Sequence, residues 1–504
     1  MTQCMKNLQM SGFKARLEKS SRRVNGLLSA LLKGYQKLSL PARAAVWFGI
    51  SQFLHRGISM LTTPFFTRLL PTEEYGLAST FVSWENILLI LIAGSSYKGV
   101  LNLCARYNDR DKMLTGIMGY NITFSFLWVL LFLLFNRWLK EITGFGNLLL
   151  VCLLLYCIFQ NVISCWSIRM QYDYKYKESV TAAVVCTAFS SFAGLLSVVF
   201  ISASAEAKII PQVVISLMVG IVLMLTVFQK GGTYYDKETW KFLFCFCIPL
   251  MPHYLSEIVL QSSDRIMINH LCGASDVAIY SVAYSVGNLI SMVTAAVNAA
   301  FAPYQFQRIK SQEYEVLARN TNRIMLFVAF CLCGIMMFGR EIVLIFGGET
   351  YADSVRLIMP ICLGAFFNYV FQLFARVQEY FEQKHTIIFA SMMCAVLNVI
   401  LNSIFIAKYG YSAAAYTTFF CYFVFCFLHY LFYRMACRRH IKREIYDSRG
   451  LAVISALLLA AAMVIYFMAE FYVIKYVLTG VVCAVGFWKR EWIVDAFAVF
   501  RKRL

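Results

Sequence analysis

Charged residues are scarce in this chain, and their scarcity excludes a soluble globular protein. Asp, Glu, Lys and Arg make up 14% of the 504 residues, whereas soluble domains contain about 25%. Hydrophobic residues make up 60%, so too little polar surface remains to cover an apolar core of this size. We therefore predict an all-α protein that crosses the membrane many times.

The chain also lacks the short motifs that catalytic, nucleotide-binding and metal sites require. It contains no glycine-rich phosphate loop, no nucleophile elbow and no pair of histidines at metal-ligand spacing. Its 17 cysteines lie almost entirely in apolar stretches, without metal-ligand spacing, and are typical of small packing residues. We therefore expect no enzymatic activity, no metal and no cofactor, and H⁺ or Na⁺ as the coupling ion if transport is coupled.

Fourteen apolar stretches have the length that a membrane span needs, about 20 residues. They are 44–66, 77–97, 115–135, 147–167, 179–202, 209–228, 241–263, 277–301, 322–339, 352–375, 386–407, 411–433, 450–469 and 471–488. No connection on the predicted outer side exceeds about twenty residues, so a catalytic domain on that side has no room. The spans themselves must carry the function.

The basic residues fall in alternate connections, and this asymmetry predicts the topology. Most of the 46 Lys and Arg lie on one side of the membrane if both termini are cytoplasmic, and only Arg56 lies well inside a span. The net charge of +19 is spread over many short cytoplasmic segments, which anionic headgroups attract. We predict a multi-pass bacterial inner membrane protein that contacts anionic lipids and does not bind nucleic acid.

An internal repeat divides the predicted spans into two equal sets. Residues 70–79 and 272–281 align at an offset of 202 residues, and each follows the first span of a set. The alignment places a carboxylate, a small residue and a serine opposite each other: Glu74 and Asp276, Gly76 and Ala278, Ser79 and Ser281. An even number of spans per copy gives a parallel repeat, which predicts two six-helix lobes around a central cavity.

The repeat predicts four segments along the chain. Residues 1–43 form a basic cytoplasmic tail, either an amphipathic interfacial helix or a disordered segment. Residues 44–239 form the N-lobe with spans 1–6, and residues 240–433 form the C-lobe with spans 7–12. Residues 434–504 contain a basic loop, an appended hairpin of spans 13 and 14, and a basic cytoplasmic tail.

Four short segments carry a resemblance to a known family. They are 68–80 (RLLPTEEYGLAST), 263–269 (SDRIMIN), 280–284 (YSVAY) and 346–351 (FGGETY). In order and spacing they resemble the polysaccharide-transport (oligosaccharide flippase) family of the multidrug/oligosaccharidyl-lipid/polysaccharide (MOP) exporter superfamily. The resemblance implies alternating access by two six-helix lobes, and a polyprenyl-pyrophosphate-linked oligosaccharide made on the cytoplasmic face as cargo. It does not identify the sugar.

Arg56 is the clearest candidate for binding this cargo. It lies roughly 18 Å along span 1 at 1.5 Å per residue, and a charge at that depth faces a cavity or a partner rather than lipid. Gln52, Arg56, Ser59 and Thr63 share one helical face. The guanidinium can engage a pyrophosphate or an acidic sugar with its bidentate fork. The alternative is an arginine that is permanently paired across the lobes. Because no second mid-membrane cation is evident, we do not expect a strongly anionic repeat unit.

Span 7 carries a second polar face, formed by His253, Glu257, Gln261 and Asp264 just after Pro249 and Pro252. The repeat offset puts Glu257 at nearly the depth of Arg56. We hypothesise that Glu257 alternates between neutralising Arg56 and carrying a coupling proton. The alternative is a static salt bridge between the lobes.

The remaining candidates divide into two sets. Lys98, Asn288, Asn298, Asn368, Gln372 and Asn398 could bind the pyrophosphate or sugar hydroxyls, although snorkelling and interhelical hydrogen bonds are the commoner uses of such residues. Glu85, His253, Gln261, Asp264 and Arg265 could act in coupling or gating, although a structural pair of Asp264 with Arg265 is an alternative.

We therefore predict a flippase that moves a polyprenyl-pyrophosphate-linked glycan, such as an O-antigen repeat unit of lipopolysaccharide, to the outer leaflet. We expect a monomeric transport unit that associates with polysaccharide polymerase machinery. One alternative is a multidrug/cation antiporter of the same superfamily, which Arg56 disfavours because like charges repel in a low-dielectric cavity. Another is a membrane glycan polymerase or ligase. The sugar, the coupling ion and the oligomeric state are not readable from the sequence.

Overall fold

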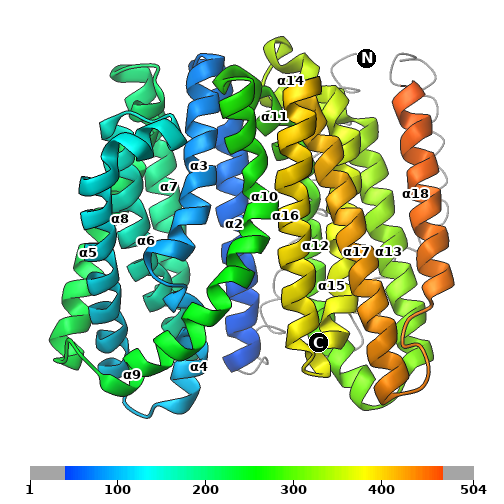
Figure 1. Cartoon of the computed structure of the whole chain (residues 1–504), viewed down its shortest axis with the longest axis horizontal. Helices are drawn as coiled ribbons and strands as arrows, with labels where there is room; N and C mark the ends of the chain where they lie inside the picture. Colours follow the sequence, from blue (N-terminus) through cyan, green and yellow to red (C-terminus); the bar gives the residue numbers. More distant parts are fainter. Residues whose placement is uncertain (1–39, 469–504) are drawn as a thin grey trace, which may run out of the picture.

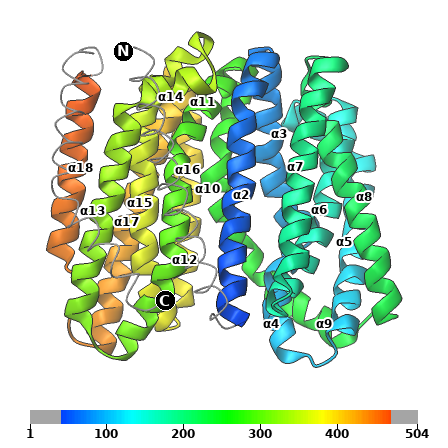
Figure 2. The ribbon, with the colours of Figure 1, turned by 180° about the vertical axis from the view of Figure 1, so that it is seen from behind.

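The computed structural model describes residues 40–468 and consists of long helices packed side by side (Figure 1). The helices before residue 232 form one side of the bundle, which we call the N-terminal group. They are α2 (Leu40–Leu69), α3 (Thr72–Ile92), α4 (Ser96–Arg106), α5 (Arg110–Thr143), α6 (Asn147–Tyr172), α7 (Tyr176–Phe200) and α8 (Ala205–Gly231). Within this group α6 packs against α8, and α2 packs against α7 (Figure 2).

The later helices form the other side of the bundle, the C-terminal group. After the short connecting α9 (Lys237–Phe242) they are η1 (Leu243–Cys247), α10 (Ile248–Leu271), α11 (Ala274–Gly287), α12 (Leu289–Lys310), α13 (Tyr314–Met337), α14 (Gly339–Phe346), η2 (Glu349–Ser354), α15 (Val355–Tyr380), α16 (Lys384–Tyr409), α17 (Ser412–His440) and α18 (Ser448–Met468). Helix α15 lies in the middle of this group and packs against α17, α13 and α11.

The all-helical fold predicted from the sequence is confirmed. Among the described residues, 12 helices are long and apolar enough to cross a membrane. Helix α2, which contains Arg56, runs beside them over 30 residues. The predicted span 471–488 and the predicted amphipathic tail lie outside the described residues. The predicted domain boundary after residue 239 falls inside α9 and stays a prediction.

One helical segment crosses from the N-terminal to the C-terminal group. Its beginning, α9, is attached to the N-terminal group, because the Trp240 indole donates to the Gly116 carbonyl at 2.9 Å and Lys112 lies 3.8 Å from Asp236. A π-helical turn, η1, follows. The next helix, α10, packs against α16 as well as α3. Pro249 and Pro252, near the start of α10, therefore lie where this segment leaves the N-terminal group and enters the C-terminal group.

Two of the four segments that resemble the transporter family, 68–80 and 346–351, contribute contacts at one end of the bundle, which we call the α14 end. There the Arg68 guanidinium donates to the Ile345 carbonyl at 3.1 Å, and the Thr67 hydroxyl donates to the Phe346 carbonyl. The Tyr75 and Tyr351 rings meet edge to face, with centroids 6.2 Å apart. These motifs therefore join α2 and α3 to the C-terminal group and lie away from Arg56.

Gly76 provides the closest approach at this end. A Cβ at this position would lie 1.7 Å from the carbonyl oxygen of Ala274, a distance that a backbone atom cannot relieve by a rotamer change. The two copies of the predicted repeat thus pack directly against each other where α3 meets α11. Glu74 links α3 to α8, because its carboxylate accepts from the Ala205 amide at the start of α8 at 2.6 Å.

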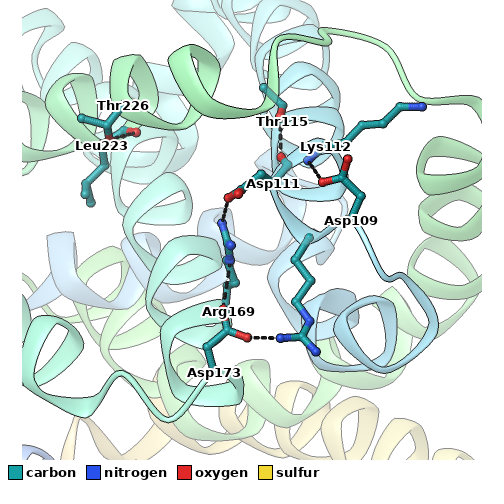
Figure 3. A network of polar contacts seen from close by, with 9 residues as sticks. Asp109, Asp111, Lys112, Thr115, Arg169, Asp173, Leu223 and Thr226 are labelled. Atoms are coloured by element: carbon teal, nitrogen blue, oxygen red, sulfur yellow. Dashed lines mark hydrogen bonds and ion pairs between the residues drawn. The ribbon is translucent and has the colours of Figure 1, made fainter.

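The opposite end, where α9 lies, holds a network of ion pairs within the N-terminal group (Figure 3). Arg169 lies 2.5 Å from Asp111 and 3.3 Å from Asp173. Arg110 pairs with Asp173 at 2.5 Å. These arginines are matched by nearby carboxylates and tie the ends of α5 and α6 together, so they leave no free charge for a ligand.

Candidate functional site

Arg56 extends from α2 toward the C-terminal group. Its Nη1 donates to the backbone carbonyl of Ser291 on α12 at 3.1 Å, and the side chain is exposed. No carboxylate pairs with this guanidinium within the described part of the chain. The charge is therefore directed across the bundle without a carboxylate partner, and the alternative of an arginine that is permanently paired across the lobes stays untested.

The neighbours of Arg56 on α2 contribute less than predicted. The Ser59 hydroxyl donates to the carbonyl of His55 on its own helix at 3.1 Å. The Thr63 hydroxyl similarly donates to the Ser59 carbonyl at 3.0 Å. The side chain of Gln52 lies outside the described residues. Arg56 is thus the group on this face that reaches the C-terminal group.

A small pocket of about 40 Å³ lies beside the Arg56 contact. Ser291, whose carbonyl holds Arg56, lines it together with Asn288 and Asn368. Tyr284 and Tyr422 form part of its aromatic wall. Asn288 and Asn368, which the sequence indicated as candidates for binding sugar hydroxyls, thus line one pocket, and that role stays a prediction. The pocket has room for a few water molecules or part of a polar ligand.

The pocket lies at a break in the eighth predicted span. Helix α11 ends at Gly287 and α12 begins at Leu289, so Asn288 stands between two shorter helices. The Ser291 hydroxyl donates to the Asn288 side-chain oxygen at 3.1 Å. The interruption is confined to one residue, because Asn288 keeps helical backbone angles and its amide donates to the Tyr284 carbonyl at 2.9 Å.

Arg376 is a second cation that the sequence reasoning missed. It lies in α15, just past the predicted end of span 10 at residue 375. Its Nη1 donates to Gln305 Oε1 at 2.5 Å, and its Nη2 donates to Asn298 Oδ1 at 2.7 Å. The sequence pattern that could have indicated Arg376 is its i, i+4, i+8 spacing from Asn368 and Gln372, which places the three residues on one helical face.

The same bonds change the roles predicted for Asn298 and Gln372. The Asn298 amide donates to Gln372 Oε1 at 2.7 Å, and the Gln372 amide donates to the Asn368 carbonyl at 3.0 Å. Their hydrogen-bonding groups are therefore directed at Arg376 and at each other. In this structure they hold the arginine, and a direct bond from either amide to cargo stays a prediction.

Glu257 does not pair with Arg56, contrary to the facing arrangement expected from the repeat. Its carboxylate lies 4.0 Å from the His253 imidazole on the same helix and interacts electrostatically with Lys98. The Lys98 ammonium lies 4.9 Å above the Tyr254 ring. The contact of Lys98 with Tyr254 brings α4 up to α10. The neighbouring Gln261 is exposed and stays a candidate without a contact to test it.

Asp264 is fully buried inside the C-terminal group. Its carboxylate accepts from the Tyr280 hydroxyl at 2.5 Å, from the Asn402 amide at 2.7 Å and from the Thr418 hydroxyl at 2.9 Å. Arg265 instead lies over the Tyr284 ring, 4.2 Å from its centroid. The suggested ion pair of Asp264 with Arg265 is therefore not formed, and neutral donors surround the carboxylate.

Asn398 belongs to this buried cluster, so the prediction that it binds cargo is wrong for this conformation. It is completely buried, accepts from the Ser263 hydroxyl at 2.9 Å and donates to Thr418 at 3.1 Å. Helical spacing identifies which residues share a face, but it does not show whether that face meets a cavity or another helix. Here α16 turns this face toward α10 and α17.

Glu85 is a partly buried carboxylate in the N-terminal group. The Gln212 amide of α8 lies 3.5 Å from one carboxylate oxygen. The Cys157 thiol of α6 lies 3.8 Å from the backbone carbonyl of Glu85. The residue therefore stands among α3, α6 and α8, apart from Arg56, and its gating role stays a prediction.

Comparison with known proteins agrees with this architecture. The profile of the family described as "Polysaccharide biosynthesis protein" matches residues 42–309, more than half of the chain. The chain belongs to this family. A second profile, MatE, matches residues 249–404, which places this polysaccharide biosynthesis protein within the wider transporter superfamily that the sequence motifs resemble.

Two bacterial proteins are similar in sequence to this family member. The "Putative O-antigen transporter" of Shigella flexneri is 24% identical over 398 residues, which cover 74% of this chain and 92% of the relative. "Lsg locus putative protein 1" of Haemophilus influenzae is 22% identical over 281 residues, which cover 54% and 67%.

Two solved structures share its fold. "Lipid II flippase MurJ, inward closed conformation" aligns with a TM-score of 0.65 at 13% identity, covering 89% of this chain and all of that one. The outward-facing conformation of a multidrug resistance MATE family transporter of the MOP superfamily aligns with a TM-score of 0.52 at 13% identity, covering 80% and 96%. At these identities the likeness concerns the fold.

Proposed function

We propose that this protein is a flippase that moves a polyprenyl-pyrophosphate-linked oligosaccharide, such as an O-antigen repeat unit, from the cytoplasmic to the outer leaflet. The observation that carries the proposal is the uncompensated Arg56 guanidinium, directed across the bundle to the rim of a polar pocket. A diphosphate headgroup supplies the negative charge that this guanidinium lacks. The similarity to an O-antigen transporter supports the same cargo class.

The direction of transport follows from the charge distribution. The connections at the α9 end are rich in Lys and Arg, and the positive-inside rule assigns such connections to the cytoplasm. On this assignment the protein lies in a bacterial inner membrane with both termini cytoplasmic. The contacts of Arg68, Tyr75 and Gly76 then lie on the outer side and close it in this conformation.

The headgroup and the lipid tail have different requirements. The diphosphate and sugars need polar partners as they pass the hydrocarbon layer, because unpaired polar groups there cost several kcal/mol. Arg56 and the amides of Asn288 and Asn368 supply such partners midway along the bundle, while the polyprenyl tail can stay in lipid. Opening of the α14 end with closure of the α9 end would then release the headgroup outside.

The first experiment is reconstitution of the wild-type protein in liposomes. A polyprenyl-diphosphate-linked oligosaccharide placed in the inner leaflet should become accessible to a lectin outside much faster than in protein-free liposomes. The same glycan on a neutral polyprenol serves as the control and should remain inside. Equal rates with and without protein, or efflux of a cationic dye in place of glycan movement, would refute the flippase and favour the antiporter.

We further propose that an ion gradient drives transport through Asp264. Its carboxylate is buried among the neutral donors Tyr280, Asn402 and Thr418, and a bare charge in such a place is costly. A proton or a Na⁺ ion at this carboxylate removes that cost. Binding of the ion would therefore change the stability of the packing between α10, α16 and α17.

Substitution Asp264→Asn tests this coupling. It keeps the shape of the side chain but removes the charge, so we expect transport to lose its dependence on an imposed H⁺ or Na⁺ gradient. Asp276→Asn, at the start of α11, is the matched control and should retain that dependence. A gradient response that survives in Asp264→Asn but disappears in Glu257→Gln would assign the coupling to Glu257 instead.

A further inference from the structure

Arg376, in the C-terminal group, is the second candidate cation after Arg56, and its surroundings differ from those of Arg110 and Arg169. Arg110 and Arg169 lie against carboxylates, which cancel their charge. Arg376 lies against the amide oxygens of Gln305 and Asn298. Neutral oxygens orient a guanidinium without neutralising it. The Glu379 carboxylate also acts on Arg376 electrostatically, but the two form no ion pair among the described residues, so the positive charge stays available.

The hydrogen-bond count leaves room for a ligand. A guanidinium has five N–H donors, and Arg376 uses one of them on Gln305 and one on Asn298. The other three find no acceptor among the described residues, and the side chain is partly exposed. A phosphate oxygen is a charged acceptor that suits these donors. Arg376 also lies on the α15 face that carries Asn368 of the pocket, two turns or about 12 Å away.

The orientation of each amide is determined by the group behind it. Because arginine can only donate, the atom that faces it must be the oxygen, and the NH₂ group must point away. The Asn298 NH₂ finds Gln372 Oε1 at 2.7 Å. The Gln305 NH₂ finds the hydroxyl of Tyr446 at 3.1 Å. Without an acceptor at the rear, either amide could rotate and present its NH₂ group to the cation.

Tyr446 comes from the connection between α17 and α18, and the C-terminal group holds this connection firmly. The Tyr446 hydroxyl donates to the Leu373 carbonyl at 3.1 Å, and its ring stacks on Tyr433 with centroids 5.4 Å apart. The Tyr433 hydroxyl accepts from the Tyr446 amide at 2.9 Å. A residue of the basic loop thus reaches a buried position behind the α12 amide.

The end of this connection is held as well. Asp447 accepts from the Gly450 amide at 2.9 Å and from the Asn322 amide at 2.8 Å. The hydrogen bonds from Gly450 and then Asn322 hold the pKa of the Asp447 carboxyl below its ordinary value. The connection is therefore attached to α13 on one side of Tyr446 and to Tyr433 on the other.

We propose that Arg376 is a second diphosphate-binding group of the transport path, and that Tyr446 is its positioning residue, acting through Gln305. This inference rests on the proposed flippase function and extends it in two ways. The headgroup then has two cationic binding positions, Arg376 toward the α9 end and Arg56 farther into the bundle. Sequence reasoning identified only Arg56. The loop before α18 also becomes part of the binding site rather than a passive connection to the last hairpin.

Binding is measured with the purified full chain in detergent, using farnesyl diphosphate as the anionic probe and farnesol as the neutral one. We expect Arg376→Gln to weaken farnesyl diphosphate binding about 30-fold, the loss of a charged contact. Gln305→Glu should weaken it similarly although Arg376 remains, because the new carboxylate neutralises the guanidinium. Tyr446→Phe should weaken it about fivefold, the loss of one hydrogen bond. Farnesol binding should be unchanged in all three variants.

Tyr430→Phe is the matched control, since Tyr430 packs in the same aromatic cluster against Phe374 and Tyr433 and should bind both probes normally. A merely structural role for Tyr446 would weaken both probes together and overturn the positioning role. Unchanged farnesyl diphosphate affinity in Arg376→Gln and Gln305→Glu, with the wild type flipping glycan, would overturn the second binding position. A wild type that binds the diphosphate but moves no glycan would instead refute the flippase function.

Discussion

Replacement of Arg56 by alanine is expected to lower glycan transport in proteoliposomes by about a hundredfold, because truncation of one partner of a desolvated charge pair costs about 2–5 kcal/mol. The guanidinium is directed at the Ser291 carbonyl and has no carboxylate partner within the described residues. The diphosphate therefore loses its cationic partner midway along the bundle. The rate of lectin access to the glycan measures this effect.

Arg56→Gln separates a charge effect from a structural one. A glutamine amide keeps an N–H donor on this face of α2 but carries no charge, which tests whether a polar group alone is sufficient. We expect Arg56→Gln to transport as poorly as Arg56→Ala. Arg56→Lys keeps the charge without the bidentate fork and should be intermediate.

The thermal unfolding midpoint of each Arg56 variant is the control for folding. It should stay near that of the wild type without ligand, and only the stabilisation by farnesyl diphosphate should be lost. If Arg56→Gln transports at the wild-type rate, a polar group alone is sufficient, and the proposed role of the charge is wrong.

Addition of one methyl group at Gly76 is expected to prevent closure of the α14 end. The Cβ in Gly76→Ala would lie 1.7 Å from the Ala274 carbonyl oxygen, so α3 and α11 must separate. Overpacking of this kind costs about 1–3 kcal/mol, which shifts the conformational equilibrium toward the open form by about 5- to 150-fold. Transport should fall because the cycle needs both conformations.

Cys272, next to this contact, reports the opening. A membrane-impermeant maleimide added outside should label Cys272 faster in Gly76→Ala than in the wild type, and Cys272→Ser identifies the labelled site. Gly146→Ala is the matched control, because an added Cβ there meets no atom within 4 Å and should change neither labelling nor transport. Normal transport by Gly76→Ala would show that close packing of α3 on α11 is not required.

The two predictions address different parts of one cycle. Arg56 and Arg376 concern the attraction of an anionic headgroup, whereas Gly76, Arg68 and Tyr75 concern the closing of one end. The family-like segment 68–80 therefore marks the closing contacts, and the cations that we propose bind cargo lie outside it. A resemblance carried by such segments can identify a transporter family without locating its ligand.

Sequence reasoning succeeded where a property depends on one helix alone. The all-helical class follows from the length and apolarity of each stretch, because a span must satisfy its own backbone hydrogen bonds. The special status of Arg56 also follows, since a charge deep in a span must avoid lipid. Neither conclusion required knowledge of how the helices pack.

Sequence reasoning failed where the contacts of a residue depend on how two helices pack against each other. Asn398 and Asn298 both lie inside predicted spans. Asn398 is buried in the cluster around Asp264, whereas Asn298 accepts a hydrogen bond from Arg376. Arg376 itself was overlooked because a charge near a predicted span end is indistinguishable from a snorkelling residue. Similarly, repeat symmetry placed Glu257 opposite Arg56, but its carboxylate lies beside His253 of its own helix instead.

The sequence by itself thus determined that the chain is a helical membrane protein with an arginine inside its first predicted span, because hydrophobicity and charge act locally along each helix. Its short motifs indicated the transporter family by resemblance. Only the tertiary structure decided which polar residues meet. It turned Arg56 to Ser291, placed Tyr446 behind Gln305 and enclosed Asp264. These outcomes depend on the rotation and crossing of neighbouring helices, and those are set by close packing, such as that of Gly76 on Ala274, and not by the pattern along any one helix.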